Sequence, residues 1–136
     1  IEASVILDFE LNIGCPKGII PDINTISWAN KINKKIKINH NPLQVSEGAD
    51  CVITDTWQSM GDEGSVSEEI YLPFQVNKNI MRQAKDNAIF MHCLPAYRDK
   101  EVSSEVLEGK QSVVFDEAEN RLHAQKAIMH FCLNSN

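Results

Sequence analysis

The chain alternates short apolar runs with segments of helical periodicity, and this alternation limits the folds it can adopt. Each run has the length of a buried strand, and no Asn-Gly hairpin turn joins one run to the next. Strands separated by helices pair in parallel and carry helices on both faces of the sheet. We therefore predict an α/β fold, a doubly wound parallel sheet flanked by helices in the Rossmann-like manner. Strands are expected at 12–16, 35–39, 51–55, 88–95 and 111–116, and helices at 1–11, 22–34, 42–48, 77–86, 104–108 and 117–133.

The run from Ala88 to Pro95 ends in a histidine, a cysteine and a Leu-Pro step. Ligands of an open parallel sheet bind beyond the carboxyl ends of the strands, which makes Cys93 a candidate functional residue. The alternative is plain packing, since a free cysteine is among the most often buried residues, and we interpret His92 as structural. An X-Pro bond becomes cis at a cost of only about 0.5–1 kcal/mol. A cis Leu94–Pro95 bond would turn the carbonyls of Cys93 and Leu94 toward a ligand.

A second apolar run, from Cys51 to Asp55, also ends in an ionisable side chain. The carboxyl ends of parallel strands meet at one edge of a sheet, so Asp55 and Cys93 are expected to lie near each other. A polar, glycine-bearing loop follows from Thr56 to Gly64, and such loops commonly carry function. The alternative for Asp55 is a turn or helix-capping residue.

Composition narrows the classes of partner. The 136 residues, 43% of them hydrophobic, suffice for one domain with its own core. A net charge of −6 argues against a nucleic-acid or anionic-membrane surface. The cysteines at 15, 51, 93 and 132 lack the spacing of a zinc site or a disulfide framework, so we predict no metal, no cofactor and a reducing, cytoplasmic compartment.

The two ends of the chain carry further expectations. Residues 1–11 have helical spacing but no N-cap residue ahead of them, so we expect the domain to lack its first strand here. The last expected helix, 117–133, has a side that we predict to be buried: Ala118, Leu122, Gln125, Ile128, Met129 and Cys132.

Three motifs in order resemble the ornithine carbamoyltransferases over essentially the whole chain. They are Asp-x-Trp-x-Ser-Met-Gly at 55–61, His-Cys-Leu-Pro at 92–95 and Glu-Ala-Glu-Asn-Arg at 117–121. The resemblance implies the carboxy-terminal, ornithine-binding domain of a two-domain subunit that assembles as a homotrimer. The family's amino-terminal Ser-x-Arg-Thr phosphate loop and His-Pro-x-Gln segment have no match in these residues, so the 136 residues alone are expected to be inactive.

The resemblance also assigns roles to individual residues. It places Asp55, Ser59 and Met60 against L-ornithine, and Cys93 with Leu94 and Arg121 against carbamoyl phosphate. Cys93 and Asp55 would be the catalytic pair. The reaction that the resemblance implies is transfer of a carbamoyl group to the δ-amine of ornithine, which must attack in its neutral form. Removing a proton from an amine of pKa about 10.4 costs about 4 kcal/mol near neutral pH, so the site must supply a partner for that proton. The Cys93 thiol is suited to exchange a proton with the amine, the Asp55 carboxylate to bind an ammonium group, and the Arg121 guanidinium to bind phosphate.

Other functions remain open at this stage. One is a carbamoyltransferase for a related amine acceptor, such as putrescine or an acylated ornithine. Another is a catalytically silent domain that binds an amino acid or a partner subunit. Two residues also have purely structural alternatives. Arg121 could form a surface ion pair worth under about 1 kcal/mol, and Trp57 could serve only in packing.

Overall fold

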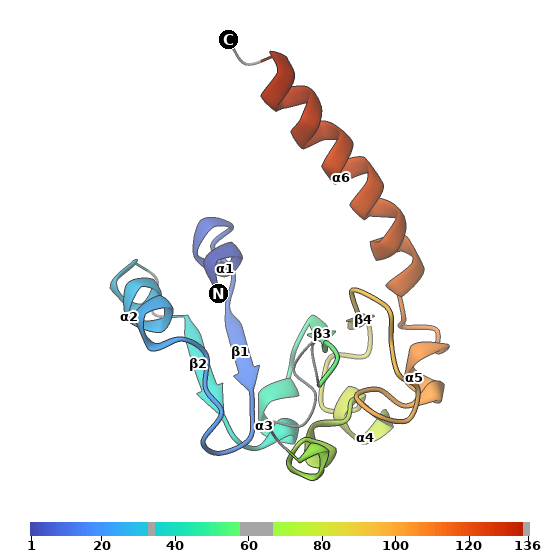
Figure 1. The fold of residues 1–136 in the computed structure, drawn as a ribbon. Helices are drawn as coiled ribbons and strands as arrows, with labels where there is room; N and C mark the ends of the chain where they lie inside the picture. Colours follow the sequence, from blue (N-terminus) through green and yellow to red (C-terminus); the bar gives the residue numbers. More distant parts are fainter. Residues whose placement is uncertain (33–34, 58–66, 135–136) are drawn as a thin grey trace.

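The computed structural model describes residues 1–32, 35–57 and 67–134. Strands and helices alternate along the chain, as predicted (Figure 1). The elements in order are α1 (Glu2–Ile6), β1 (Leu11–Gly14), α2 (Ile23–Ile32), β2 (Ile36–Asn39), α3 (Pro42–Ser46), β3 (Cys51–Ile53), the 3₁₀ turns η1 (Glu68–Ile70) and η2 (Leu72–Phe74), α4 (Lys78–Met81), β4 (Ile89–Met91), α5 (Ser104–Leu107) and α6 (Val114–Asn134).

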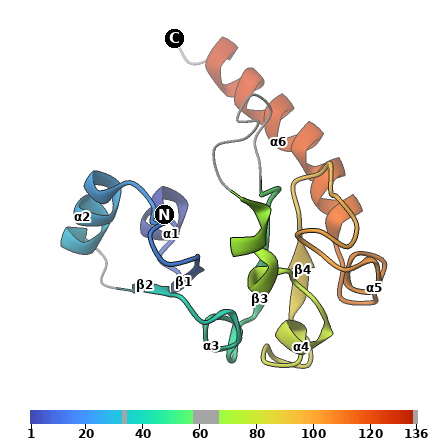
Figure 2. The same cartoon turned by 60° about the horizontal axis from the view of Figure 1, so that its bottom comes forward.

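The described strands pair in parallel, which confirms the predicted direction of the sheet. β1 pairs with β2, and β3 pairs with β4, so the described strands form two separate two-stranded parallel sheets (Figure 2). In the second pair Cys51 lies opposite Ile89 and Ile53 lies opposite Met91. This register brings the carboxyl ends of β3 and β4 to the same edge.

The core is centred on β4. Phe90, in the middle of this strand, is fully buried, and its neighbours come from segments on both sides of it in the sequence. Apolar side chains from α4, α5, the start of α6 and the bridged residues that precede α4 and α5 complete this core: Val76, Ile80, Met81, Val102, Val106, Leu107 and Val114. Burial of this kind stabilises a side chain by roughly 1.5–3 kcal/mol, so β4 is held firmly and its carboxyl end is a fixed platform.

Several helices begin at the capping residues that the sequence indicates. The Asp22 carboxylate accepts a hydrogen bond of 2.7 Å from the Thr25 N–H and caps α2. Asn41 caps α3, with Pro42 at the first helical position, and Asn77 caps α4. The predicted helices at 1–11 and 77–86 are shorter than expected, since α1 and α4 span only five and four residues.

The prediction of a strand at 111–116 is largely wrong. Ser112 forms an isolated parallel bridge with Phe90, and the chain then turns into α6 at Val114. The Val113 carbonyl accepts the N–H of Glu117 at 2.9 Å, which begins the helix. Short β-branched runs do not distinguish a strand from the first turn of a helix.

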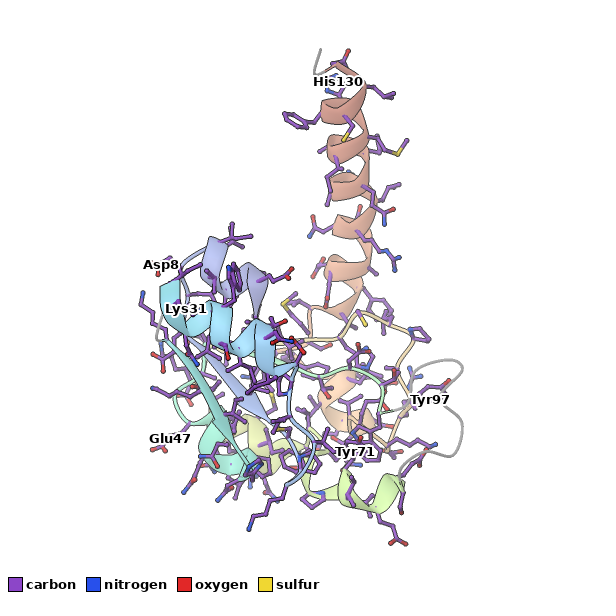
Figure 3. All side chains as sticks on the ribbon, turned by 60° about the vertical axis from the view of Figure 1, so that its left-hand side comes forward. Asp8, Lys31, Glu47, Tyr71, Tyr97 and His130 are labelled. Carbon is purple, nitrogen blue, oxygen red and sulfur yellow. The ribbon has the colours of Figure 1, made fainter. Side chains whose placement is uncertain are left out.

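The predicted buried side of the last helix is also wrong for this chain. α6 projects away from the remainder of the described chain, and His130 lies near its far end in Figure 3. Leu122, Ile128 and Met129 are each about 60% exposed, at 59, 62 and 61%, and Ala118, Gln125 and Cys132 are exposed as well. No described element packs along this side. No described helix is long and apolar enough to cross a membrane.

Candidate functional site at the ends of β3 and β4

Asp55 and Cys93 meet at the common edge of β3 and β4. Each lies two residues beyond the paired positions Ile53 and Met91, so the parallel register carries both side chains to the same place. The Cys93 Sγ donates a hydrogen bond of 3.2 Å to the Asp55 Oδ1. Both residues are exposed, and the pair is therefore open to a ligand.

The charges of this pair favour a protonated thiol beside a carboxylate. The pKa of the Cys93 thiol is raised, chiefly by burial. The hydrogen bond to Asp55, the charge of Asp55 and the charge of Glu117 raise it further, in that order. Partial burial also raises the pKa of the Asp55 carboxyl, but hydrogen bonds from the Thr56 N–H and the Cys93 thiol outweigh it and leave this pKa below its ordinary value. At neutral pH the edge therefore presents a negative carboxylate, suited to an ammonium group.

A buried pair below the surface supports the loop that carries Cys93. His92 is fully buried, and its Nε2 lies 3.2 Å from the Oε1 of Glu101, which is 1% exposed. The Leu94 N–H donates to the His92 Nδ1 at 2.9 Å, so these partners assign the imidazole proton to Nε2. The Glu101 Oε1 also accepts the Tyr97 N–H at 2.6 Å. The structural interpretation of His92 is consistent with this network.

The backbone after Cys93 has an unusual conformation. The predicted cis Leu94–Pro95 bond is confirmed. Leu94 has φ of 54°, in the left-handed region that side chains with a Cβ rarely adopt, at a cost of about 1–2 kcal/mol. The hydrogen bond from the Leu94 N–H to the His92 Nδ1 stabilises this conformation.

The other predicted residues are placed less completely. Ser59 and Met60 lie outside the described residues. Arg121 is exposed on α6, one helical turn beyond Glu117, whose carboxylate lies at the end of β4. Trp57 stacks on Tyr71 with ring centroids 5.9 Å apart, in agreement with a packing role. Among the described residues, no three His, Cys, Asp or Glu side chains gather as a metal site.

The motifs assign no role to two carboxylates that the structure places here, Glu101 and Glu117, although Glu117 begins the Glu-Ala-Glu-Asn-Arg motif. Glu101 supports His92 from a distant loop, and Glu117 accepts the His92 N–H from the first turn of α6. Glu101 ends the charged run from Arg98, which is typical of an exposed turn, yet it is buried. In the sequence, Glu101 stands out only by its place in a short charged run, and no pattern indicates that it is buried.

Alkylation of Cys93 should report the raised pKa directly. Because the thiolate is the reactive form, the pH midpoint for iodoacetamide modification is expected above that of cysteine in an unfolded peptide, and Asp55→Asn should lower it. The folded state binds this proton more tightly, so its contribution to stability is present at neutral pH and is lost as the pH rises through the raised pKa. Mass spectrometry of the Cys93 peptide measures the midpoint. A midpoint at or below that of the free peptide would contradict the assignment.

Comparison with known proteins places this site in a family. The family model described as "Aspartate/ornithine carbamoyltransferase, Asp/Orn binding domain" matches residues 1–132. The chain belongs to this family. An ornithine carbamoyltransferase of Brucella abortus is 51% identical over 134 residues, which are 98% of this chain and 43% of that protein. The chain thus spans less than half the length of this carbamoyltransferase.

Solved structures agree. The ornithine carbamoyltransferase of Campylobacter jejuni superposes with a TM-score of 0.91 at 36% identity, over 98% of this chain and 46% of that one. The enzyme of Pyrococcus furiosus gives a TM-score of 0.86 at 41% identity, over 93% and 42%. The described chain is therefore one domain of a two-domain fold, with parallel strands and flanking helices.

Proposed function

We propose that this chain is the ornithine-binding half of an ornithine carbamoyltransferase, which transfers the carbamoyl group of carbamoyl phosphate to the δ-amine of L-ornithine and yields citrulline and phosphate. The observation that carries the proposal is the Asp55–Cys93 pair at the ends of two parallel strands. A carboxylate and a thiol 3.2 Å apart match the needs of an amine that must lose a proton before it attacks.

The charges at the site account for the transfer of a proton from the δ-ammonium of ornithine to Cys93. The ammonium of ornithine binds the Asp55 carboxylate, and its positive charge offsets the negative field that keeps the Cys93 thiol protonated. The pKa of Cys93 then falls, the thiol releases its proton to solvent, and the resulting thiolate accepts a proton from the δ-ammonium. The neutral amine attacks the carbamoyl carbon, the bond from that carbon to the phosphate oxygen breaks, and the leaving phosphate takes the second proton of the attacking nitrogen.

Arg121 and the backbone of Cys93 and Leu94 would hold the carbamoyl phosphate. A guanidinium forms bidentate hydrogen bonds with phosphate, and such charged contacts are worth about 1.5–3 kcal/mol. Arg121→Ala is expected to raise the KM for carbamoyl phosphate by roughly 10- to 150-fold. The control is Lys126→Ala, which removes an exposed cation elsewhere on α6. Steady-state kinetics of the complete subunit measure both, and equal KM values for the two variants would contradict the role of Arg121.

The proposal extends to the rest of the subunit. The Brucella abortus relative is more than twice as long as the matched region, and the exposed apolar side of α6 needs a covering surface. We assign that cover to an amino-terminal, carbamoyl-phosphate-binding half, within a cytoplasmic homotrimer. Ser59 and Met60 complete the ornithine contacts in this proposal.

Citrulline formation tests the proposal. The chain is mixed with the separately produced amino-terminal half of the Brucella abortus relative and supplied with carbamoyl phosphate. Ornithine, putrescine and N-acetyl-L-ornithine are compared as acceptors, the last because an N-acetyl-L-ornithine transcarbamylase superposes with a TM-score of 0.77 at 29% identity. Citrulline from ornithine in excess of either other product is expected. A larger rate with another acceptor, or no product with any, would contradict the assignment.

A further inference from the structure

Glu117 occupies the junction between β4 and α6. The Phe90 N–H donates to the Gln111 carbonyl at 2.7 Å, and the Val113 N–H donates to the Phe90 carbonyl at 3.0 Å. Alternate residues of a strand point their N–H groups toward the same neighbour, so the next donor on this side is His92. The following rung would use the Val113 carbonyl, but that carbonyl accepts the Glu117 N–H.

The Glu117 side chain supplies the missing acceptor. Its Oε2 accepts the His92 N–H at 2.9 Å, in a place where the His92 residue is fully buried. An unpartnered N–H there would cost about 1–3 kcal/mol. The contact thus joins the first turn of α6 to the Met91–His92 peptide, one residue before Cys93.

The same carboxylate lies close to the reactive groups. The charge of Glu117 contributes to the raised pKa of the thiols of Cys93 and Cys51, after burial in both cases. Arg121 follows Glu117 by four residues and therefore shares its face of α6. Glu117 is partly buried, whereas Asp116 and Glu119 on the same turns are exposed.

We infer that Glu117 is a positioning residue that fixes the base of α6 on the Met91–His92 peptide at the end of β4 and so sets the separation of Arg121 from Cys93. The inference rests on the proposed function for the roles of Arg121 and Cys93. It adds a specific contact that couples the carbamoyl-phosphate side of the site to the ornithine side. The hydrogen bond, rather than the charge, carries the positioning.

The variants Glu117→Ala and Glu117→Gln separate the two properties in the complete subunit. Glutamine keeps an oxygen that accepts the His92 N–H but removes the charge, and alanine removes both. Glu117→Ala is expected to lower kcat/KM for carbamoyl phosphate by roughly 10- to 100-fold, because a small misplacement of a binding group has effects of this size. Glu117→Gln should restore it to within about threefold of the parent. Asp116→Ala is the control for loss of an acidic residue in the first turn of α6.

Two readouts distinguish positioning from general destabilisation. Hydrogen exchange of the His92 amide should accelerate in Glu117→Ala but not in Glu117→Gln, and it is measured without any catalytic assay. The pH midpoint for alkylation of Cys93 should fall in both variants, since both lack the charge. Equal kinetic defects in the two variants, or unchanged exchange at His92 in Glu117→Ala, would overturn the inference. If the parent forms no citrulline, the proposed function fails, while the exchange and alkylation data still decide the contact.

Discussion

Replacement of Asp55 by asparagine is expected to lower kcat/KM for ornithine by about 100- to 1000-fold, equivalent to roughly 3–4 kcal/mol. In the proposed function the carboxylate is the negative group that meets the ammonium of ornithine, and it accepts the hydrogen bond of the Cys93 thiol at 3.2 Å. Asparagine preserves the shape of the side chain but carries no charge, so the ammonium loses its partner. The KM for carbamoyl phosphate should change by less than about threefold, because the proposal assigns that substrate to Arg121 and the backbone of Cys93 and Leu94. Steady-state kinetics of the complete subunit measure both parameters.

Asp50→Asn is the matched control for Asp55→Asn. Asp50 precedes β3 at the opposite end of the strand and forms an exposed ion pair with Lys85 at 2.6 Å. Exposed pairs of this kind contribute about 0–1 kcal/mol to stability, and Asp50 lies away from the carboxyl end of β3. Its variant should retain the parent kinetics. Comparable losses of kcat/KM in the two variants would show that the carboxylate of Asp55 has no special part in ornithine binding.

Glu101→Ala is expected to destabilise the protein by about 3–5 kcal/mol, the largest stability effect that the structure implies. The Glu101 carboxylate accepts both the His92 Nε2–H and the Tyr97 N–H, and the pair with His92 is almost completely buried. Alanine leaves both donors without a partner in the core. Urea unfolding, followed by far-UV circular dichroism, measures the change in the free energy of unfolding.

Two further variants make the Glu101 prediction specific. Glu101→Gln keeps an acceptor oxygen and should cost less than Glu101→Ala. Glu108→Ala removes a carboxylate whose ion pair with Arg98 is more than half exposed, and it should cost under about 1 kcal/mol. An effect of Glu101→Ala no larger than that of Glu108→Ala would rule out a supporting role for the buried pair.

The parallel fold and the centre of the site were predictable from the sequence for one shared reason. Short apolar runs separated by helical segments predict parallel strands, and parallel strands end at a common edge. Asp55 and Cys93 each follow such a run, and the structure places them in hydrogen-bond contact. Helix starts were also predictable, because the capping residue lies next to the helix in the sequence. Asp22, Asn41 and Asn77 cap the helices that follow them.

Features that depend on distant contacts were not predictable. Glu101 and Glu117 act on His92 from 9 and 25 residues away in sequence. Glu117 begins a recognisable motif, but nothing near either residue indicates its contact with His92. The strand expected at 111–116 becomes a bridge and a helix start because the Val113 carbonyl bonds within α6. The apolar side of α6 follows a correct helical period, but periodicity does not say which surface covers it.

The central claim is that ornithine binds where β3 and β4 end, with its amine between Asp55 and Cys93. A structure of the complete subunit with bound L-ornithine tests it most directly. The account predicts a side-chain or α-amino nitrogen of ornithine within about 3.5 Å of the Asp55 carboxylate, with Cys93 in van der Waals contact with the ligand. Ornithine bound at another edge of the fold, with neither residue in contact, would contradict it.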